Sequence, residues 1–246
     1  MAGAVVLVVV LSTVGAFVGS RKTSNSSSTT TTAPTNTTLP KNGIDPTPAE
    51  PGATLTGPTP CPAADGSSPR TTTFAEGPPM CIDTGYFYSA VITTSVGAMT
   101  VQLNPQQSPN SVNAFAVLAG YHFYDGQRIT DVTTRASFTI GTAFTSPVTN
   151  APGFAIAAEQ PKGGTVFTPG SLAIRPTDAS GIGAQLVVST FELAAGNDQN
   201  VNPLGVMLSG DDTIATIDAL ASRSGAPTKS VTIESIVVTR TSPIPN

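Results

Sequence analysis

The sequence SPNSVNAF, from Ser108 to Phe115, decides how the middle of this chain folds. Serine is preferred just before a helix, and proline suits the first helical position because its missing N–H would find no partner there. Val112, Phe115 and Ala119 follow at helical spacing, and Gly120 is a typical helix end. The stretch therefore predicts an amphipathic helix that Ser108 caps.

Short apolar runs with strand-like character surround this helix. Upstream, residues 88–94 and 98–103 are rich in β-branched residues and meet at Gly97, which predicts a hairpin. Downstream, four runs are separated by glycine and proline: 138–140, 171–174, 185–188 and 204–208. Their number and spacing favour a mainly β fold, a sheet that closes into a barrel.

The C-terminal part predicts a second helix and a last strand. The helix starts at Asp211 or Asp212, where acidic side chains favour the positive end of the helix dipole. The strand covers residues 230–239, and its apolar residues change parity between Ile233 and Ile236. That change predicts a β-bulge or a twist onto a second face.

The first 60 residues carry two different compositions. Ala2–Val18 is almost entirely apolar and slightly short for a bilayer, so a membrane anchor, a cleaved signal peptide and a buried helix of the fold all remain open. Arg21 and Lys22 follow it. From Thr23 to Thr38, 12 of 16 residues are serine or threonine, which predicts a disordered spacer.

We divide the chain into five parts on this basis. They are an apolar segment (1–22), a Ser/Thr/Pro-rich linker (23–60), a collar (61–85), a folded domain (86–240) and a tail (241–246). Cys61 and Cys81, 20 positions apart, predict a structural disulfide in the collar, since an exported chain meets oxidising conditions.

The composition excludes several functions. A net charge of −4 without a basic cluster argues against nucleic acid as a partner. One histidine and two cysteines are too few for a usual zinc site, and a Ser-His-Asp triad would depend on that single histidine. The short glycine pairs fit no phosphate-binding loop, so we expect no metal and no cofactor.

Several strings, in the same order along the chain, resemble the cyclophilin family of peptidyl-prolyl cis-trans isomerases. They include Ser108–Phe115, the segment Tyr121–Gly126, Pro169–Ile174 and Gly181–Gln185. The collar around Cys61 resembles the membrane-anchored, extracytoplasmic branch from actinobacteria. The resemblance spans Cys61 to Thr239 and implies an eight-stranded antiparallel barrel with two capping helices.

The resemblance breaks at the catalytic residues. The family places an arginine in a Phe-His-Arg string, which corresponds here to Ile129-Thr130-Asp131. Isomerisation has a barrier of about 18–20 kcal/mol, and a guanidinium donates hydrogen bonds to the twisted bond, which an ionised carboxylate cannot do. The family's glutamine falls at Gly141 or Thr142, and its aromatic wall at Leu186-Val187.

The resemblance thus implies a peptide groove whose candidate residues are Ile129, Asp131, Phe138, Thr142, Arg175, Gln185, Val187 and Leu204. Phe138 is either the floor of the proline pocket or plain core. Arg175 stands where the family has a small residue. It either pairs with Asp131 across the pocket or extends outward into solvent.

Three functions remain open. The first is an extracytoplasmic cyclophilin-like domain with impaired catalysis, which binds a proline-containing peptide or an exported or envelope protein. The second is a slow but active isomerase that assists the folding of exported proteins. The third is a structural envelope module whose groove Arg175 fills. In each case we expect a monomeric domain, held at the membrane by the N-terminal segment or secreted.

Overall fold

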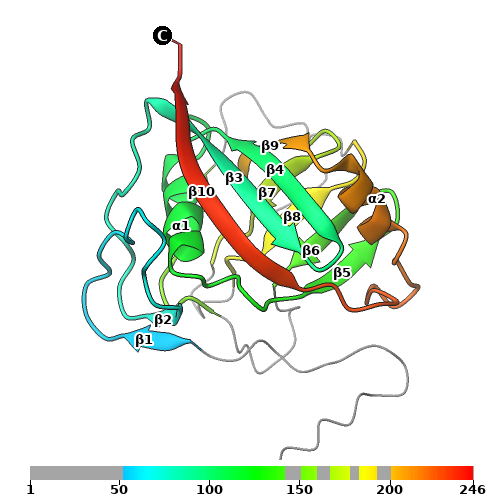
Figure 1. Ribbon diagram of the computed structural model, residues 1–246, viewed down its shortest axis with the longest axis horizontal. Helices are drawn as coiled ribbons and strands as arrows, with labels where there is room; N and C mark the ends of the chain where they lie inside the picture. Colours follow the sequence, from blue (N-terminus) through cyan, green and yellow to red (C-terminus); the bar gives the residue numbers. More distant parts are fainter. Residues whose placement is uncertain (1–51, 142–150, 160–166, 178–182, 193–200, 246) are drawn as a thin grey trace, which may run out of the picture. The chain divides into compact units, whose positions relative to one another are not determined.

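The computed structural model describes residues 52–141, 151–159, 167–177, 183–192 and 201–245 (Figure 1). All of them belong to the compact unit Leu39–Asn246. The apolar segment, most of the predicted linker and Thr142 lie outside the described residues. Among the described residues, neither helix is long and apolar enough to cross a membrane.

Ten strands and two helices lie within these residues. In chain order they are β1 (Ala53–Leu55), β2 (Thr71–Phe74), β3 (Tyr86–Thr94), β4 (Gly97–Leu103), α1 (Pro109–Gly120), β5 (Ile129–Thr133), β6 (Ser137–Ile140), β7 (Ser171–Ile174), β8 (Leu186–Ser189), β9 (Asn202–Ser209), α2 (Asp211–Asp218) and β10 (Ile233–Pro243). The predicted hairpin, both helices and all four downstream runs are confirmed as elements.

Eight strands form one antiparallel sheet in the order β10-β3-β4-β9-β7-β8-β6-β5. The expectation of a mainly β fold with eight antiparallel strands and two helices is confirmed, although the ladder is open, with β10 and β5 at its edges, and does not close into a barrel. The two edges meet at a single bridge between Arg128 and Thr232. The N–H of Ile129 donates to the Val231 carbonyl at 3.0 Å beside this bridge.

The predicted irregularity in the last strand is present. The pairing of β10 with β3 shifts between Ile233 and Ser235. Ile233 and Ile236 both face the core despite their odd spacing, at 0% and 3% exposure. The bulge is therefore what lets both side chains point inward.

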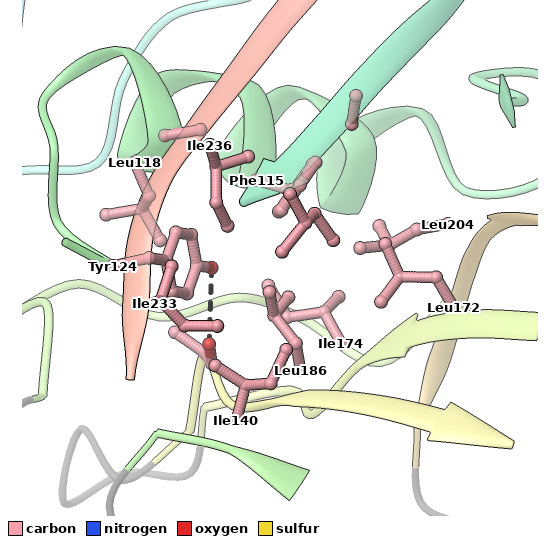
Figure 2. Packing of buried hydrophobic residues seen from close by; sticks show 14 of the residues in the cluster. Phe115, Leu118, Tyr124, Ile140, Leu172, Ile174, Leu186, Leu204, Ile233 and Ile236 are labelled. Carbon is pink, nitrogen blue, oxygen red and sulfur yellow. Dashed lines mark hydrogen bonds between the residues drawn. The ribbon is translucent and has the colours of Figure 1, made fainter. Parts of the chain in front are cut away.

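The core lies between the sheet and α1, which packs on β9 and β10. Figure 2 shows Phe115 and Leu118 of α1 above Ile174 and Leu186 of the sheet. Tyr124 is fully buried in this core, and its hydroxyl donates to the Ala184 carbonyl at 3.2 Å. Burial raises the pKa of Tyr124 far above its ordinary value.

Ser108 is the N-cap residue of α1, as expected, but its side chain does not cap the helix. The carboxylate of Glu159 takes that role. It accepts from the N–H groups of Asn110 (3.1 Å) and Ser111 (2.7 Å), and also from the side chains of both residues. A carboxylate is well placed here because the first-turn N–H groups have no partner within the helix.

The disulfide closes a loop within the collar, and aromatic packing holds the collar to the rest of the domain. Cys61 and Cys81 are bonded, with Cα atoms 5.5 Å apart. The ring of Phe74, 1% exposed, makes edge contacts with Tyr121 and Phe154, at centroid distances of 5.5 and 5.9 Å. Phe74 therefore packs against the C-terminal end of α1 through Tyr121.

Ordered structure begins before the predicted collar boundary. β1 pairs in parallel with β2, and Thr59 is 2% exposed with its hydroxyl donating to the Glu76 carbonyl. The last part of the predicted linker is therefore folded, because its backbone completes a small sheet with the collar. From here on, "the collar" means residues 52–85.

Candidate functional site

The strand register places one row of side chains on the outside of the sheet. Residues directly opposite each other in antiparallel strands point to the same face. The row that starts at the position of the expected catalytic arginine is Asp131 (β5), Thr139 (β6), Val187 (β8), Ala173 (β7) and Pro203 (β9). The neighbouring row, which includes Phe138 and Leu172, faces the core.

A second outer row lies at the ends of β7 and β8. The N–H of Arg175 donates to the Gln185 carbonyl at 2.9 Å, and the N–H of Ala184 donates to the Arg175 carbonyl at 3.0 Å. Arg175 and Gln185 lie two residues beyond Ala173 and Val187, so they share the outer face. We call these six residues, Asp131, Thr139, Ala173, Arg175, Gln185 and Val187, the site face.

The site face has an apolar part that is separate from the main core. Ala173, Val187 and Val201 are buried together, and the ring of Phe167 packs against them. The replacement of a family aromatic by Val187 makes this cluster small. Its three members are 1%, 4% and 9% exposed, so they form a small apolar cluster on the outer side of the strands that the protein itself largely covers.

Two opposite charges lie on the site face. Asp131 is exposed and Arg175 is half-buried. Burial lowers the pKa of the Arg175 guanidinium, and the negative charge of Asp131 opposes this effect. Arg175 is thus partly withdrawn from solvent and feels the charge of Asp131, and whether the two side chains pair stays open.

Asp131 lies against the loop that follows α2. The N–H of Val132 donates to the Gly225 carbonyl at 2.7 Å. A Cβ added to Gly225 would approach the Asp131 Oδ1 to 2.6 Å, and Gly225 has a positive φ of 83°. Glycine is therefore needed there both for the turn and for the room that the carboxylate occupies.

Two buried polar atoms at the site make no hydrogen bond with any described residue. One is the side-chain oxygen of Gln185, a residue that is 4% exposed. The other is the hydroxyl of Thr130, at the register shift in β5 between Ile129 and Asp131. Gly141 is next to Gln185 and brings no side chain that would satisfy this oxygen.

The structure separates the predicted groove residues into two groups. Asp131, Arg175, Gln185 and Val187 share the site face. Ile129, Phe138 and Leu204 are at most 3% exposed and belong to the main core, apart from the site face, so their assignment to the groove stays a prediction (Figure 2 shows Leu204). For Phe138 the plain-core interpretation holds, because its register partner Val188 also faces inward.

Sequence reasoning missed Thr139, Ala173 and Val201. Thr139 and Ala173 alternate with core residues in short strands that are buried on both sides, so periodicity carries little information there. Val201 precedes β9 and shows no local pattern. The cross-strand register brings Thr139 and Ala173 to the site, and packing against Ala173 and Val187 brings Val201.

The described residues contain no group of three histidine, cysteine or acidic side chains that would hold a metal ion. His122 lies away from the site face, at the end of α1, where its ring contacts Asp125 and the Gly66 carbonyl. The chemistry available on the site face is therefore hydrogen bonding, charge and apolar contact.

Comparisons with known proteins agree with this fold. The family model "Cyclophilin type peptidyl-prolyl cis-trans isomerase/CLD" matches residues 89–238. A search of curated proteins found no match.

Two solved structures illustrate the similarity of fold. A Cryptosporidium parvum cyclophilin type peptidyl-prolyl cis-trans isomerase is 18% identical, with a TM-score of 0.54, and the match covers 63% of this chain and 98% of that one. The mimivirus cyclophilin is 16% identical, with a TM-score of 0.51, and the match covers 64% of this chain and 92% of that one. This chain belongs to the cyclophilin-type peptidyl-prolyl cis-trans isomerase family.

Proposed function

We propose that this chain is a cyclophilin-type domain that binds proline-containing segments of peptides or proteins but catalyses their isomerisation poorly. The observation that carries the proposal is Asp131. It stands on the site face where the family resemblance expects the catalytic arginine, and it is exposed. An ionised carboxylate only accepts hydrogen bonds, so it cannot stabilise the twisted peptide bond as a guanidinium does.

Two features support retained binding. Ala173, Val187 and Val201 form an apolar cluster on the outer side of the strands, and the side-chain oxygen of Gln185 is a buried acceptor that no described residue satisfies. A bound peptide supplies both an apolar ring and backbone N–H groups. The Cryptosporidium relative has also been crystallised in the presence of the dipeptide Ala-Pro.

The location we propose is outside the cytoplasmic membrane. The support is the apolar segment Ala2–Val18, the Ser/Thr-rich stretch after it and the Cys61–Cys81 disulfide. Disulfides persist in oxidising compartments. The partners proposed on this basis are exported or envelope proteins, with the N-terminal segment either holding the chain at the membrane or being cleaved.

The direct experiment measures binding and catalysis on one sample. The full chain is titrated into a proline-containing peptide, and NMR follows both the peptide's chemical shifts and its cis-trans exchange. The proposal expects shift changes that saturate while the exchange rate stays near its uncatalysed value. Fast exchange at catalytic amounts of protein would refute impaired catalysis, and the absence of any shift change would refute binding.

A slow isomerase is the second candidate, and Arg175 is the observation that favours it. Arg175 is half-buried on the site face, its backbone N–H donates to the Gln185 carbonyl, and the charge of Asp131 acts to raise the pKa of its guanidinium. In this case a residual rate disappears in Arg175→Gln and survives in Arg128→Gln, a control outside the site face. Equal rates in the two variants would exclude Arg175 as the donor.

A further inference from the structure

His122 lies at the C-terminal end of α1 in a conformation that is uncommon for histidine. Its φ is 55°, in the left-handed region. The N–H of Phe123 donates to the Leu118 carbonyl and the N–H of His122 to the Ala119 carbonyl, which is the Schellman arrangement that ends helices. The backbone thus fixes the direction of the ring, at a place where the helix dipole favours a positive charge.

Both ring nitrogens of His122 face oxygen atoms that only accept hydrogen bonds. Nδ1 is 2.9 Å from Oδ2 of Asp125, and Nε2 is 3.1 Å from the backbone carbonyl oxygen of Gly66 in the collar. A neutral imidazole carries one N–H and donates only one bond, whereas an imidazolium donates two. The two contacts are therefore satisfied together only when His122 is protonated.

The other charges around this ring come from the collar and from the turn itself. Asp125 has its second oxygen, Oδ1, buried without a hydrogen bond from a described residue, which favours a cation beside it. Arg70 of the collar donates to the Asp125 backbone carbonyl at 2.8 Å. Asp65 precedes Gly66 and accepts from the N–H and hydroxyl of Ser67.

We propose that His122 is a pH-dependent latch between α1 and the collar. In its protonated form it joins Asp125 to Gly66 and holds the collar loop 63–68 against the end of the helix. Loss of the proton removes one of the two bonds and loosens this loop. The latch is closed at lower pH and opens at higher pH, because only the protonated ring donates both bonds.

Hydrogen exchange of the full chain tests the latch. The amide of Gly66 is bonded to the Ala63 carbonyl, and that of Ser67 to Asp65, so their protection reports the order of the loop. After correction for the intrinsic pH dependence of exchange, we expect their protection to fall about three- to fivefold between pH 5.5 and pH 8.

Two variants distinguish the latch from a general loosening of the collar. In His122→Asn, which tolerates the left-handed backbone, protection is reduced and no longer depends on pH. Tyr121→Phe removes another collar bond, from the tyrosine hydroxyl to the Pro60 carbonyl at 3.1 Å. Burial raises the pKa of Tyr121, so this hydroxyl does not titrate between pH 5.5 and pH 8.

The Tyr121→Phe variant therefore loosens the collar and keeps the pH dependence of the parent. Protection in the parent that is independent of pH would overturn the latch. The same conclusion follows if His122→Asn retains the parent's pH dependence, because another group would then be responsible.

Discussion

At the first turn of α1, the carboxylate of Glu159 accepts four hydrogen bonds, whereas on the site face the side-chain oxygen of Gln185 accepts none from a described residue. A buried polar atom without a partner costs about 1–3 kcal/mol, so a fold keeps few of them. The contrast is between a carboxylate whose hydrogen bonds hold the helix start and an amide oxygen that the described residues leave without a partner.

The collar contributes to stability, and replacing its buried residue Phe74 gives the largest expected loss of unfolding free energy. Phe74→Ala removes a fully buried ring that contacts Tyr121 and Phe154, and we expect the free energy of unfolding to fall by about 3–5 kcal/mol. Urea denaturation measures this change. Phe191→Ala, at a ring that is 44% exposed, is the control and costs less than about 1 kcal/mol. Similar losses in both variants would mean that the collar is not part of the core.

The cap of α1 gives the next largest effect. Glu159→Ala leaves two first-turn N–H groups and two side chains without their acceptor, so we expect a loss of about 2–4 kcal/mol in unfolding free energy. The exposed Glu192 provides the matched control, since its replacement by alanine changes stability by no more than about 0.5 kcal/mol. A loss below 1 kcal/mol for Glu159→Ala would show that Ser108 or water caps the helix instead.

This cap also shows where prediction from sequence succeeds and fails. Ser108 and Pro109 correctly located the start of α1, because capping preferences are local. Glu159 lies 48 residues after Ser111, and no local pattern connects the two. The bulge in β10 was predictable from the changed parity of its apolar residues, which is again a local signal.

The site face depended on register and was predicted only in part. Family resemblance located Asp131, Arg175, Gln185 and Val187. It also assigned Phe138 to the groove, but Phe138 pairs with Val188 and faces the core. In a four-residue strand buried on both faces, the sequence does not say which side is outside. Likewise, β1 lies in a proline-rich stretch without a strand pattern, and its partner among the described residues is the short strand β2.

A smaller change in stability, caused by Tyr124, is expected at alkaline pH. Burial raises the pKa of Tyr124, so above about pH 10 the unfolded chain loses this proton while the folded chain retains it. The parent should therefore lose stability relative to Tyr124→Phe by about 1.4 kcal/mol per pH unit above pH 10. Urea denaturation at pH 9, 10 and 11 measures the difference. A constant difference across these pH values would contradict the burial of Tyr124.

The smallest change in stability is expected at two buried glutamines. They allow a direct comparison of a side chain that is hydrogen-bonded with one whose oxygen has no partner among the described residues. Gln127 and Gln185 are both 4% exposed, but the Nε2 of Gln127 donates to the Phe123 carbonyl at 2.9 Å. We expect Gln127→Met to cost about 1–2 kcal/mol and Gln185→Met to be neutral or slightly stabilising. Thermal unfolding of both variants checks this order. An equal cost at Gln185 would mean that its side-chain oxygen has a partner after all.

The central claim is that Asp131 limits catalysis on an otherwise preserved fold. Its most direct test is kcat/KM for isomerisation of a proline-containing peptide by the parent, Asp131→Arg and Asp131→Asn, with circular dichroism to confirm folding. The account predicts a nearly inactive parent, a gain of about 100-fold in Asp131→Arg, and little gain in Asp131→Asn, which removes the charge without adding a guanidinium. A parent whose kcat/KM equals or exceeds that of Asp131→Arg would contradict it.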